Sequence, residues 1–262
     1  MKLDLKKLIT LFVLLLSLQL SYSQLGFSHE VGVITGPVAF QSDFGERYDF
    51  ETNSGNTGFG IGLVYFMNFD YLTNYYYSSA NNYFTDHFKI RAEISWNKTK
   101  LNHFGKWVDT ERTGPSADKL RAHSGESQNW NLGAQLEYYP LSIKAFSQGA
   151  FSLTPFGSVG IQYVSFNPTV NTTYGDQNFE NPNNFYPLWE PGSIDDKGGS
   201  TWSAVASLGA RYKLTVLSDL MIDLRFQQFF HDSVDGLDHQ LASNKANDWL
   251  LWLNFGYIYY FD

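Results

Sequence analysis

The chain of 262 residues contains no cysteine. This absence excludes disulfides, zinc–thiolate sites, thiol catalysis and a lipid anchor attached to cysteine. Basic residues are also scarce, because 18 Lys and Arg stand against 26 Asp and Glu and give a formal net charge of −8. A negatively charged chain is poorly suited to the phosphate backbone, so no nucleic acid partner is expected.

Long apolar runs are missing from most of the chain. Beyond residue 23 no stretch reaches the ~20 apolar residues that a membrane-spanning helix requires. The mostly apolar segment 8–20 follows three lysines, and Ser21-Tyr22-Ser23 offers small residues to a signal peptidase. We therefore predict a cleaved signal peptide over residues 1–23. The alternative, a membrane-anchoring helix, is disfavoured because the apolar run is short and interrupted by polar residues.

The chain does contain segments in which apolar and polar residues alternate. Eight stretches of the mature region, residues 24–262, alternate apolar and polar residues with a period of two, which is typical of β-strands. The clearest runs from Phe88 to Asn97, where Lys89, Arg91 and Glu93 interrupt an apolar row. The predicted strands cover residues 27–39, 58–69, 86–98, 129–140, 155–166, 201–214, 219–229 and 248–261.

The two faces of these strands differ sharply in chemistry. A soluble protein seldom buries Lys, Arg and Glu together and seldom exposes long apolar rows. A small membrane barrel does both, with lipid outside and a polar lumen inside. We therefore predict an all-β fold, an eight-stranded antiparallel transmembrane up-and-down β-barrel. A lipocalin-like soluble barrel is the main architectural alternative, because alternation does not tell which face points inward.

Connections and aromatic residues agree with the membrane interpretation. The expected outer connections, residues 40–57, 99–128, 167–200 and 230–247, are on average longer than the inner ones. Aromatic residues make up 18% of the chain and gather toward the strand ends, as they do at membrane interfaces. The expected interfacial residues are Trp130, Tyr138, Tyr139, Trp202, Tyr212, Tyr257, Tyr259 and Tyr260.

Together these features resemble small outer-membrane barrels of the OmpA transmembrane type. The Ser23-Gln24 junction and the abundance of Asn and Tyr are similar to outer-membrane barrels of Bacteroidota, including the PorT and PorG components of the type IX secretion system. The resemblance implies the outer membrane of a Gram-negative cell envelope, contact with outer-membrane lipid, and envelope or secretion-machinery proteins as partners. The chain departs from the pattern at its end, where Asp262 follows the aromatic Phe261.

The inward rows carry both signs of charge on neighbouring strands. The predicted lumen charge network consists of Glu30, Lys89, Arg91, Glu93, Glu137, Arg211, Asp223 and Arg225, with Lys213 beside it. An eight-stranded barrel is just wide enough for side chains to fill it, and buried charges require partners. We therefore predict a plugged lumen rather than an ion path.

Signals for catalysis and cofactors are weak. His231, Asp232, Asp235, Asp238 and His239 form the densest metal-like group, but they lack the order of a calcium-binding loop and suit a solvated acidic loop better. His87 could serve a barrel lipid hydrolase, yet no Ser–His–acid order is assignable. The Gly-rich residues 58–62 lie inside a strand and not before a helix, so they are no dinucleotide-binding loop. We predict no enzyme activity, cofactor or metal.

The outer segment 167–200 is the most distinctive connection. Its aromatic residues Phe179, Phe185, Tyr186 and Trp189 suggest a loop binding surface or a lid over the barrel mouth. The alternative is a loop that simply packs on the neighbouring connection. The leading prediction is a structural or binding role through long outer loops. Alternatives are an accessory component of the type IX secretion or gliding machinery and a barrel lipid hydrolase.

Overall fold

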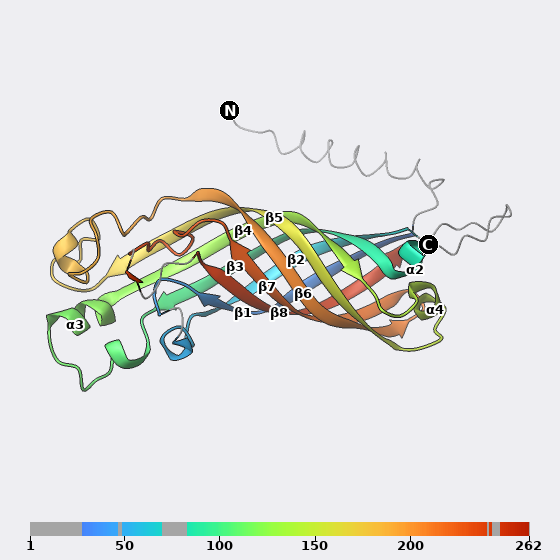
Figure 1. The fold of residues 1–262 in the computed structure, drawn as a ribbon, viewed down its shortest axis with the longest axis horizontal. Helices are drawn as coiled ribbons and strands as arrows, with labels where there is room; N and C mark the ends of the chain where they lie inside the picture. The colour runs from blue at the N-terminus through green and yellow to red at the C-terminus, as the bar shows by residue number, and fades with distance from the viewer. Residues whose placement is uncertain (1–27, 47–48, 70–82, 240, 243–246, 262) are drawn as a thin grey trace, which may run out of the picture.

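Eight antiparallel strands pair in sequence order, and β8 returns to pair with β1 and closes a barrel (Figure 1). This computed structural model describes residues 28–46, 49–69, 83–239, 241–242 and 247–261. The strands are β1 (Ser28–Gln41), β2 (Thr57–Asn68), β3 (Phe88–Asn102), β4 (His123–Tyr138), β5 (Leu153–Thr172), β6 (Gly199–Thr215), β7 (Ser218–Phe229) and β8 (Trp249–Phe261). All eight predicted strands are confirmed, as is the up-and-down topology. The predicted signal peptide lies outside the described residues.

Short helices occupy the connections. They are α2 (Tyr83–His87), α3 (Pro115–Ala122) and α4 (Ile143–Ser147), with 3-10 turns η1 (Phe50–Thr52), η2 (Gly105–Trp107) and η3 (Pro182–Asn184). Within the described part of the chain, no helix has the length and apolar character needed to cross a membrane.

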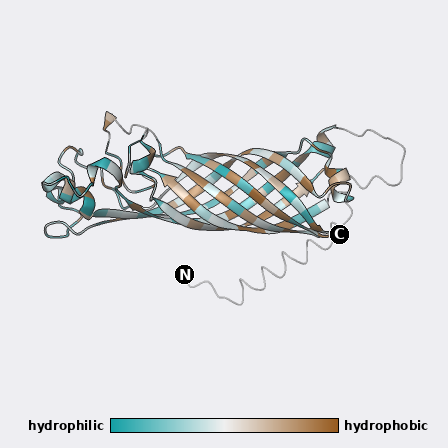
Figure 2. Ribbon diagram, turned by 90° about the horizontal axis from the view of Figure 1, so that it is seen from below, coloured by the Kyte–Doolittle hydropathy of each residue, from teal (hydrophilic) through white to brown (hydrophobic). Residues whose placement is uncertain are grey.

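The apolar rows face outward and the charged rows face the bore. Leu63, Leu132, Val159 and Leu208 are 56%, 61%, 64% and 75% exposed, whereas Arg91 is fully buried. Figure 2 shows hydrophobic and hydrophilic residues alternating along the strands, while the loops beyond one end are largely hydrophilic. This orientation is that of a transmembrane barrel, and it excludes the lipocalin-like alternative.

Six of the eight expected interfacial aromatic residues lie on the exterior, namely Trp130, Tyr138, Trp202, Tyr212, Tyr257 and Tyr259. The prediction was wrong for Tyr139 and Tyr260, which are 1% and 9% exposed. Each directly follows an outward-facing aromatic residue, and strand alternation turns the next side chain inward. Their hydroxyl groups bond to bore carboxylates described below.

Strands at the outer end run further than predicted. β3 continues to Asn102, β4 begins at His123 and β5 continues to Thr172, within segments expected to be loops. The outward residues there, such as Lys100, Glu126 and Asn167, are polar. The apolar row that revealed the strands therefore ends where they leave the hydrocarbon region, although their pairing continues.

Both ends of the bore are closed by apolar side chains. At the inner end, Ile143 and Phe146 of α4 are buried within the end of the barrel. At the outer end, Val234 and Leu237 of the β7–β8 connection are fully buried against Phe40 and other members of the same core. The Ser127 hydroxyl of β4 donates to the Val234 carbonyl oxygen at 2.7 Å and holds this outer cap in place.

Candidate functional site: the bore and its outer mouth

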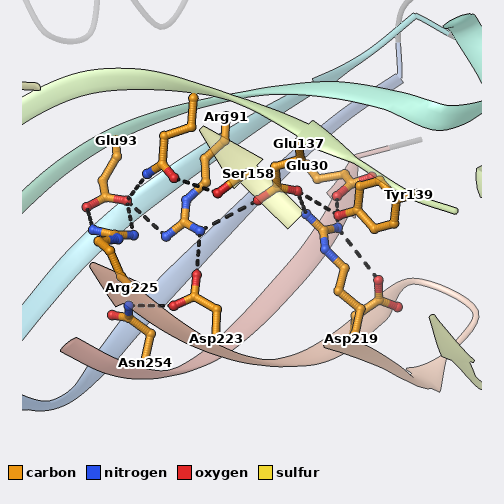
Figure 3. A network of polar contacts seen from close by, with 12 residues as sticks. Glu30, Arg91, Glu93, Glu137, Tyr139, Ser158, Asp219, Asp223, Arg225 and Asn254 are labelled. Carbon is orange, nitrogen blue, oxygen red and sulfur yellow. Dashed lines mark hydrogen bonds and ion pairs between the residues drawn. The ribbon is translucent and has the colours of Figure 1, made fainter. Parts of the chain in front are cut away.

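The predicted charges meet in the bore as one ion-pair network (Figure 3). Alternation on β3 directs Arg91 and Glu93 inward, and β7 contributes Asp223 and Arg225 from the far wall. Arg91 lies 2.9 Å from Glu93 and 2.8 Å from Asp223, and Arg225 lies 2.5 Å from Glu93. All four side chains are buried, so the charges neutralise one another across the barrel.

A second group lies toward the inner end. Arg211 lies 2.5 Å from Glu30 and 3.4 Å from Glu137, and Lys89 pairs with the other oxygen of Glu30. Glu137 joins the two groups, because its second oxygen lies 3.6 Å from Arg91. The structure thus brings all eight predicted lumen residues into one connected network of buried ion pairs.

Three further members of this network, Asp219, Tyr139 and Tyr260, were not predicted to face the bore. Asp219 lies 3.1 Å from Lys213 and accepts a hydrogen bond from the hydroxyl of Tyr260. The Tyr139 hydroxyl donates to Glu137 at 2.6 Å. Asp219 was detectable, because it lies four residues before Asp223 and therefore on the same face of β7.

Bulky side chains fill the bore beyond the charges. Trp252 of β8 is fully buried, and the Arg225 guanidinium lies 5.1 Å from its ring centre. A Cβ on Gly60 would lie 2.4 Å from the Trp252 ring, so this strand glycine makes room for the indole. Gly60 belongs to the Gly-rich run that was predicted to lie inside a strand, and β2 contains it.

Three aspartates gather at the outer mouth. Asp43 follows β1, Asp235 belongs to the β7–β8 connection and Asp248 precedes β8; all are at most 2% exposed. The Asp43 backbone N–H donates to Asp235 at 3.0 Å, and the His239 backbone N–H donates to Asp43 at 3.1 Å. Asp248 accepts from the N–H groups of Val234 and Asp235 at 3.1 and 3.2 Å. These carboxyl groups fasten the outer cap to the barrel rim.

Burial makes ionisation of these carboxyl groups costly. It raises the pKa of Asp43 from 3.8 to about 9, and the neighbouring Asp235 adds to the shift. Burial likewise raises the pKa of Asp235 to about 7. The pKa of Asp248 is also well above 3.8, through burial and then through Asp235 and Asp43. Neutral pH therefore leaves part of the cluster protonated.

The predicted metal-like group does not assemble as a site. Asp235 points into the mouth, whereas Asp232 is less buried than Asp235. The described residues contain no group of three or more His, Asp or Glu arranged to hold a metal ion. Histidines that the sequence analysis did not single out pair instead. The ring nitrogens of His103 and His123 lie 2.7 Å apart, and the Phe44 ring stacks on both rings.

The four predicted loop aromatics occupy different environments. Phe185 is 3% exposed and meets the His123 ring edge-on, while Trp189 packs against the apolar core of the mouth and stacks on His239. Phe179 is 40% exposed. Tyr186 lies beside Trp189, with ring centres 6.0 Å apart. The β5–β6 connection thus folds across the mouth, and part of its aromatic surface is buried there.

A cavity of about 130 Å³ lies among the outer loops. All four outer connections line it, with Asp43 and Glu46 from the first, His103 and Trp107 from the second, Tyr186 and Trp189 from the third and His239 from the fourth. Its mostly apolar walls with a few convergent polar groups are like those of small-molecule sites, and its volume suits a ligand smaller than a drug molecule.

His87, considered for a hydrolase, holds the inner end together. One of its ring nitrogens lies 2.6 Å from the Tyr139 carbonyl oxygen. The Ser142 hydroxyl donates to Asp86 at 2.9 Å and caps α4 by accepting from the Ala145 N–H. These contacts join α2 to α4.

No protein-family model and no curated protein matches the chain. Among solved structures, the chain is similar to Ail, the attachment invasion locus protein of Yersinia pestis, solved in complex with the heparin analogue sucrose octasulfate. The identity is 9%, 90% of this chain and 100% of that chain are covered, and the TM-score is 0.41. The outer membrane protein OprG from Pseudomonas aeruginosa gives 14% identity, coverage of 89% and 95%, and a TM-score of 0.40.

A major outer membrane protein from Thermus thermophilus gives 13% identity, coverage of 89% and 99%, and a TM-score of 0.47. Identities and TM-scores this low say nothing about function. The closed eight-stranded barrel is established by the strand pairing of this chain itself.

Proposed function

We propose that this chain is a non-conducting outer-membrane barrel that binds a ligand or partner through its outer loops. The apolar exterior with its aromatic ends supports insertion in a bilayer. The export signal predicted from the sequence and the resemblance to OmpA-type barrels support the outer membrane as the location.

One observation carries the non-conducting part of the proposal. The bore holds a connected network of buried ion pairs, and apolar caps close it at both ends. An ion that crossed would have to displace paired charges and both caps. The outer loops, in contrast, pack around a cavity to which every one of them contributes. The chemistry available to a partner is therefore concentrated at the outer end.

The proposal includes the absence of enzyme activity. The buried carboxylates of the bore are engaged by guanidinium, ammonium or hydroxyl groups, and His87 is engaged with backbone at the inner end. An accessory role in type IX secretion is a narrower form of the same proposal, and only the sequence resemblance supports it.

Reconstitution tests the barrel and its bore. The mature protein should require detergent for extraction from the cell envelope and migrate differently on gels with and without boiling. In planar bilayers it should give no steady conductance steps. Reproducible conductance from the folded protein would refute the closed bore.

Partner capture tests the role of the loops. Pull-downs from detergent-solubilised envelopes are compared for the natural chain and for a variant in which residues 176–196 are replaced by a Gly-Ser linker. A matched control carries the same kind of replacement at residues 109–113, the exposed tip of the β3–β4 connection. Loss of a captured partner only in the first variant supports the proposal. Equal capture by all three proteins contradicts it.

A further inference from the structure

The loop cavity combines aromatic walls with acidic groups. Phe44, Trp107, Tyr186 and Trp189 supply rings from three connections. Cations already occur on one of these walls, since the Arg112 guanidinium lies 4.5 Å and the Lys106 ammonium 5.3 Å from the Trp107 ring. Aromatic faces attract cations because the ring quadrupole is negative above the plane.

The charged side chains that line the cavity itself are of one sign. Among the described residues that line it, none is Lys or Arg, whereas Asp43 and Glu46 are both acidic. Burial lowers the pKa of His103 to about 3 and also lowers the pKa of His239, so both rings are neutral at pH 7. The ionisable groups that face the cavity therefore favour a positively charged occupant.

The two carboxyl groups differ in their surroundings. Glu46 lies on the rim, where it accepts from Lys106 at 2.8 Å and from the Trp107 indole N–H at 2.5 Å. Asp43 lies deeper at 2% exposure, beside the buried Asp235. Asp43 is thus the carboxyl group deep in the cavity, on the side where the acidic side chains are most concentrated.

We propose that this cavity binds an organic ammonium ion, with the charged group against Asp43 and the apolar body between the rings of Trp107, Tyr186 and Trp189. The identification rests on the proposed binding role of the outer loops and names its ligand class. A cation beside Asp43 gains an ion pair in a poorly solvated site, and the aromatic walls bury its apolar part.

Three probes of similar size separate charge from shape. 2-Phenylethylammonium, neutral 2-phenylethanol and anionic phenylacetate are titrated into the folded, detergent-solubilised mature protein by calorimetry at pH 9, where a pKa of about 9 leaves the Asp43 carboxyl partly ionised. The ammonium ion should bind at least about tenfold more tightly than the alcohol, as a charge-assisted contact provides, and the anion should bind most weakly. Equal binding of ammonium and alcohol, or binding of none of the three, overturns the inference.

Substitutions locate the charge preference. Asp43→Asn keeps the side-chain volume and should reduce the preference for ammonium over alcohol to within about twofold, since the ion pair is lost. Glu111→Gln removes an exposed charge of the β3–β4 connection and should leave the preference unchanged. If Asp43→Asn does not fold, Trp107→Leu on the 38% exposed rim provides the test. That variant should weaken ammonium binding by about threefold and alcohol binding less, and equal weakening of both contradicts the inference.

A pH series gives an independent readout. The titratable groups around Asp43 are Asp232, Asp235, Asp238, His239 and Asp248 of the last connection, with Glu46 and His103 on the same cavity. Because the pKa of Asp43 is about 9 in the empty cavity, a bound cation must displace its proton at pH 7. Binding of benzyltrimethylammonium, whose charge does not titrate, should tighten by up to about tenfold per pH unit between 7 and 9. A flat profile overturns the role of Asp43.

These outcomes are separable from the proposed function. Failure of the ammonium series removes the ligand class, while conductance and partner capture still decide whether the barrel is closed and whether its loops bind. Conducting barrels or unchanged capture would refute the proposed function irrespective of any amine.

Discussion

The bore and the outer mouth both bury ionisable groups, and they accommodate the charge in opposite ways. In the bore, guanidinium and ammonium groups lie between carboxylates of β1, β3, β4 and β7. At the mouth, the aspartates lie close to one another and accept hydrogen bonds from backbone N–H groups. The bore is therefore electrostatically complete, whereas the mouth responds to protons and to added cations.

The largest expected effect comes from removing a charge from the bore. Glu93→Leu leaves Arg91 and Arg225 without their shared carboxylate, and it should lower the free energy of unfolding by about 3–5 kcal/mol. Urea unfolding in lipid or detergent, followed by the gel-mobility shift, measures this. The double variant Glu93→Leu/Arg225→Leu should recover part of the loss, because fewer unpaired charges remain. A single variant as stable as the natural chain would contradict the network.

The next largest loss of stability is expected when a charge is introduced on the outer face of the barrel. Leu208 faces outward between Trp202 and Tyr212 of β6, and Leu208→Arg should cost about 2–4 kcal/mol if that face contacts the bilayer centre. Val216→Arg, in the 82% exposed β6–β7 turn, is the control and should change stability by less than about 0.5 kcal/mol. Equal effects of the two substitutions would argue against a lipid-facing exterior.

A smaller effect, confined to the mouth, depends on pH. The folded pKa values of Asp43 and Asp235, about 9 and about 7, lie above the ordinary 3.8. Between pH 3.8 and these folded pKa values, the folded mouth binds more protons than the unfolded chain. The stability of the mouth is therefore greatest below about pH 4 and falls as the pH rises toward 9. Amide exchange at Val234 and Leu237, corrected for intrinsic rates, should accelerate from pH 6 to pH 8 by up to about tenfold per unit for each carboxyl that titrates.

Substitution identifies the groups responsible for this pH dependence. Asp235→Asn should lower the slope by up to about tenfold per pH unit below pH 7, because one of the titrating carboxyls is replaced by a neutral amide, and Asp43→Asn should lower it up to about pH 9. Asp176→Asn, in the β5–β6 connection, should not, because hydrogen bonds from Asn184 and Asn181 hold the pKa of Asp176 low. A slope that persists unchanged in Asp235→Asn and Asp43→Asn would show that other groups control the cap.

The smallest effect is expected at an exposed ion pair. Lys98 and Glu126 lie 2.6 Å apart on the outside of β3 and β4, and both side chains are about one-third exposed or more. Glu126→Gln should change the free energy of unfolding by less than about 1 kcal/mol, since exposed pairs are weak. A loss as large as that of Glu93→Leu would remove the contrast between buried and surface charge.

The barrel itself was predictable from the sequence, since lipid on one face and a charged bore on the other impose alternation that survives in a single chain. The same rule placed Arg91, Glu137 and Arg225 in the interior. It failed at the outer ends of β4 and β5, because strands surrounded by water on their outer face need no apolar row. The short helices α2 and α4 escaped notice because five residues carry too little helical periodicity to detect.

The aspartate cluster at the mouth could not be predicted from the sequence, for a different reason. Asp43 and Asp235 are separated by 192 positions, and only closure of the barrel brings β1 beside the last connection. The acidic run at residues 231–239 was recognised, but its partner Asp43 was not, and the run was therefore interpreted as a solvated acidic loop rather than as part of a buried cluster. Long-range clusters of this kind leave no local spacing to recognise.

The uneven length of the strands gives the barrel a sloping rim. β5 continues nine residues beyond Tyr163 to Thr172, whereas β7 ends three residues beyond Phe226 (Figure 1). In a membrane, the long end of β5 therefore holds the β5–β6 connection above the lipid headgroups. Antibodies, phage tails or proteases that approach from outside would therefore meet the β5–β6 connection before they reach the outer cap over the bore.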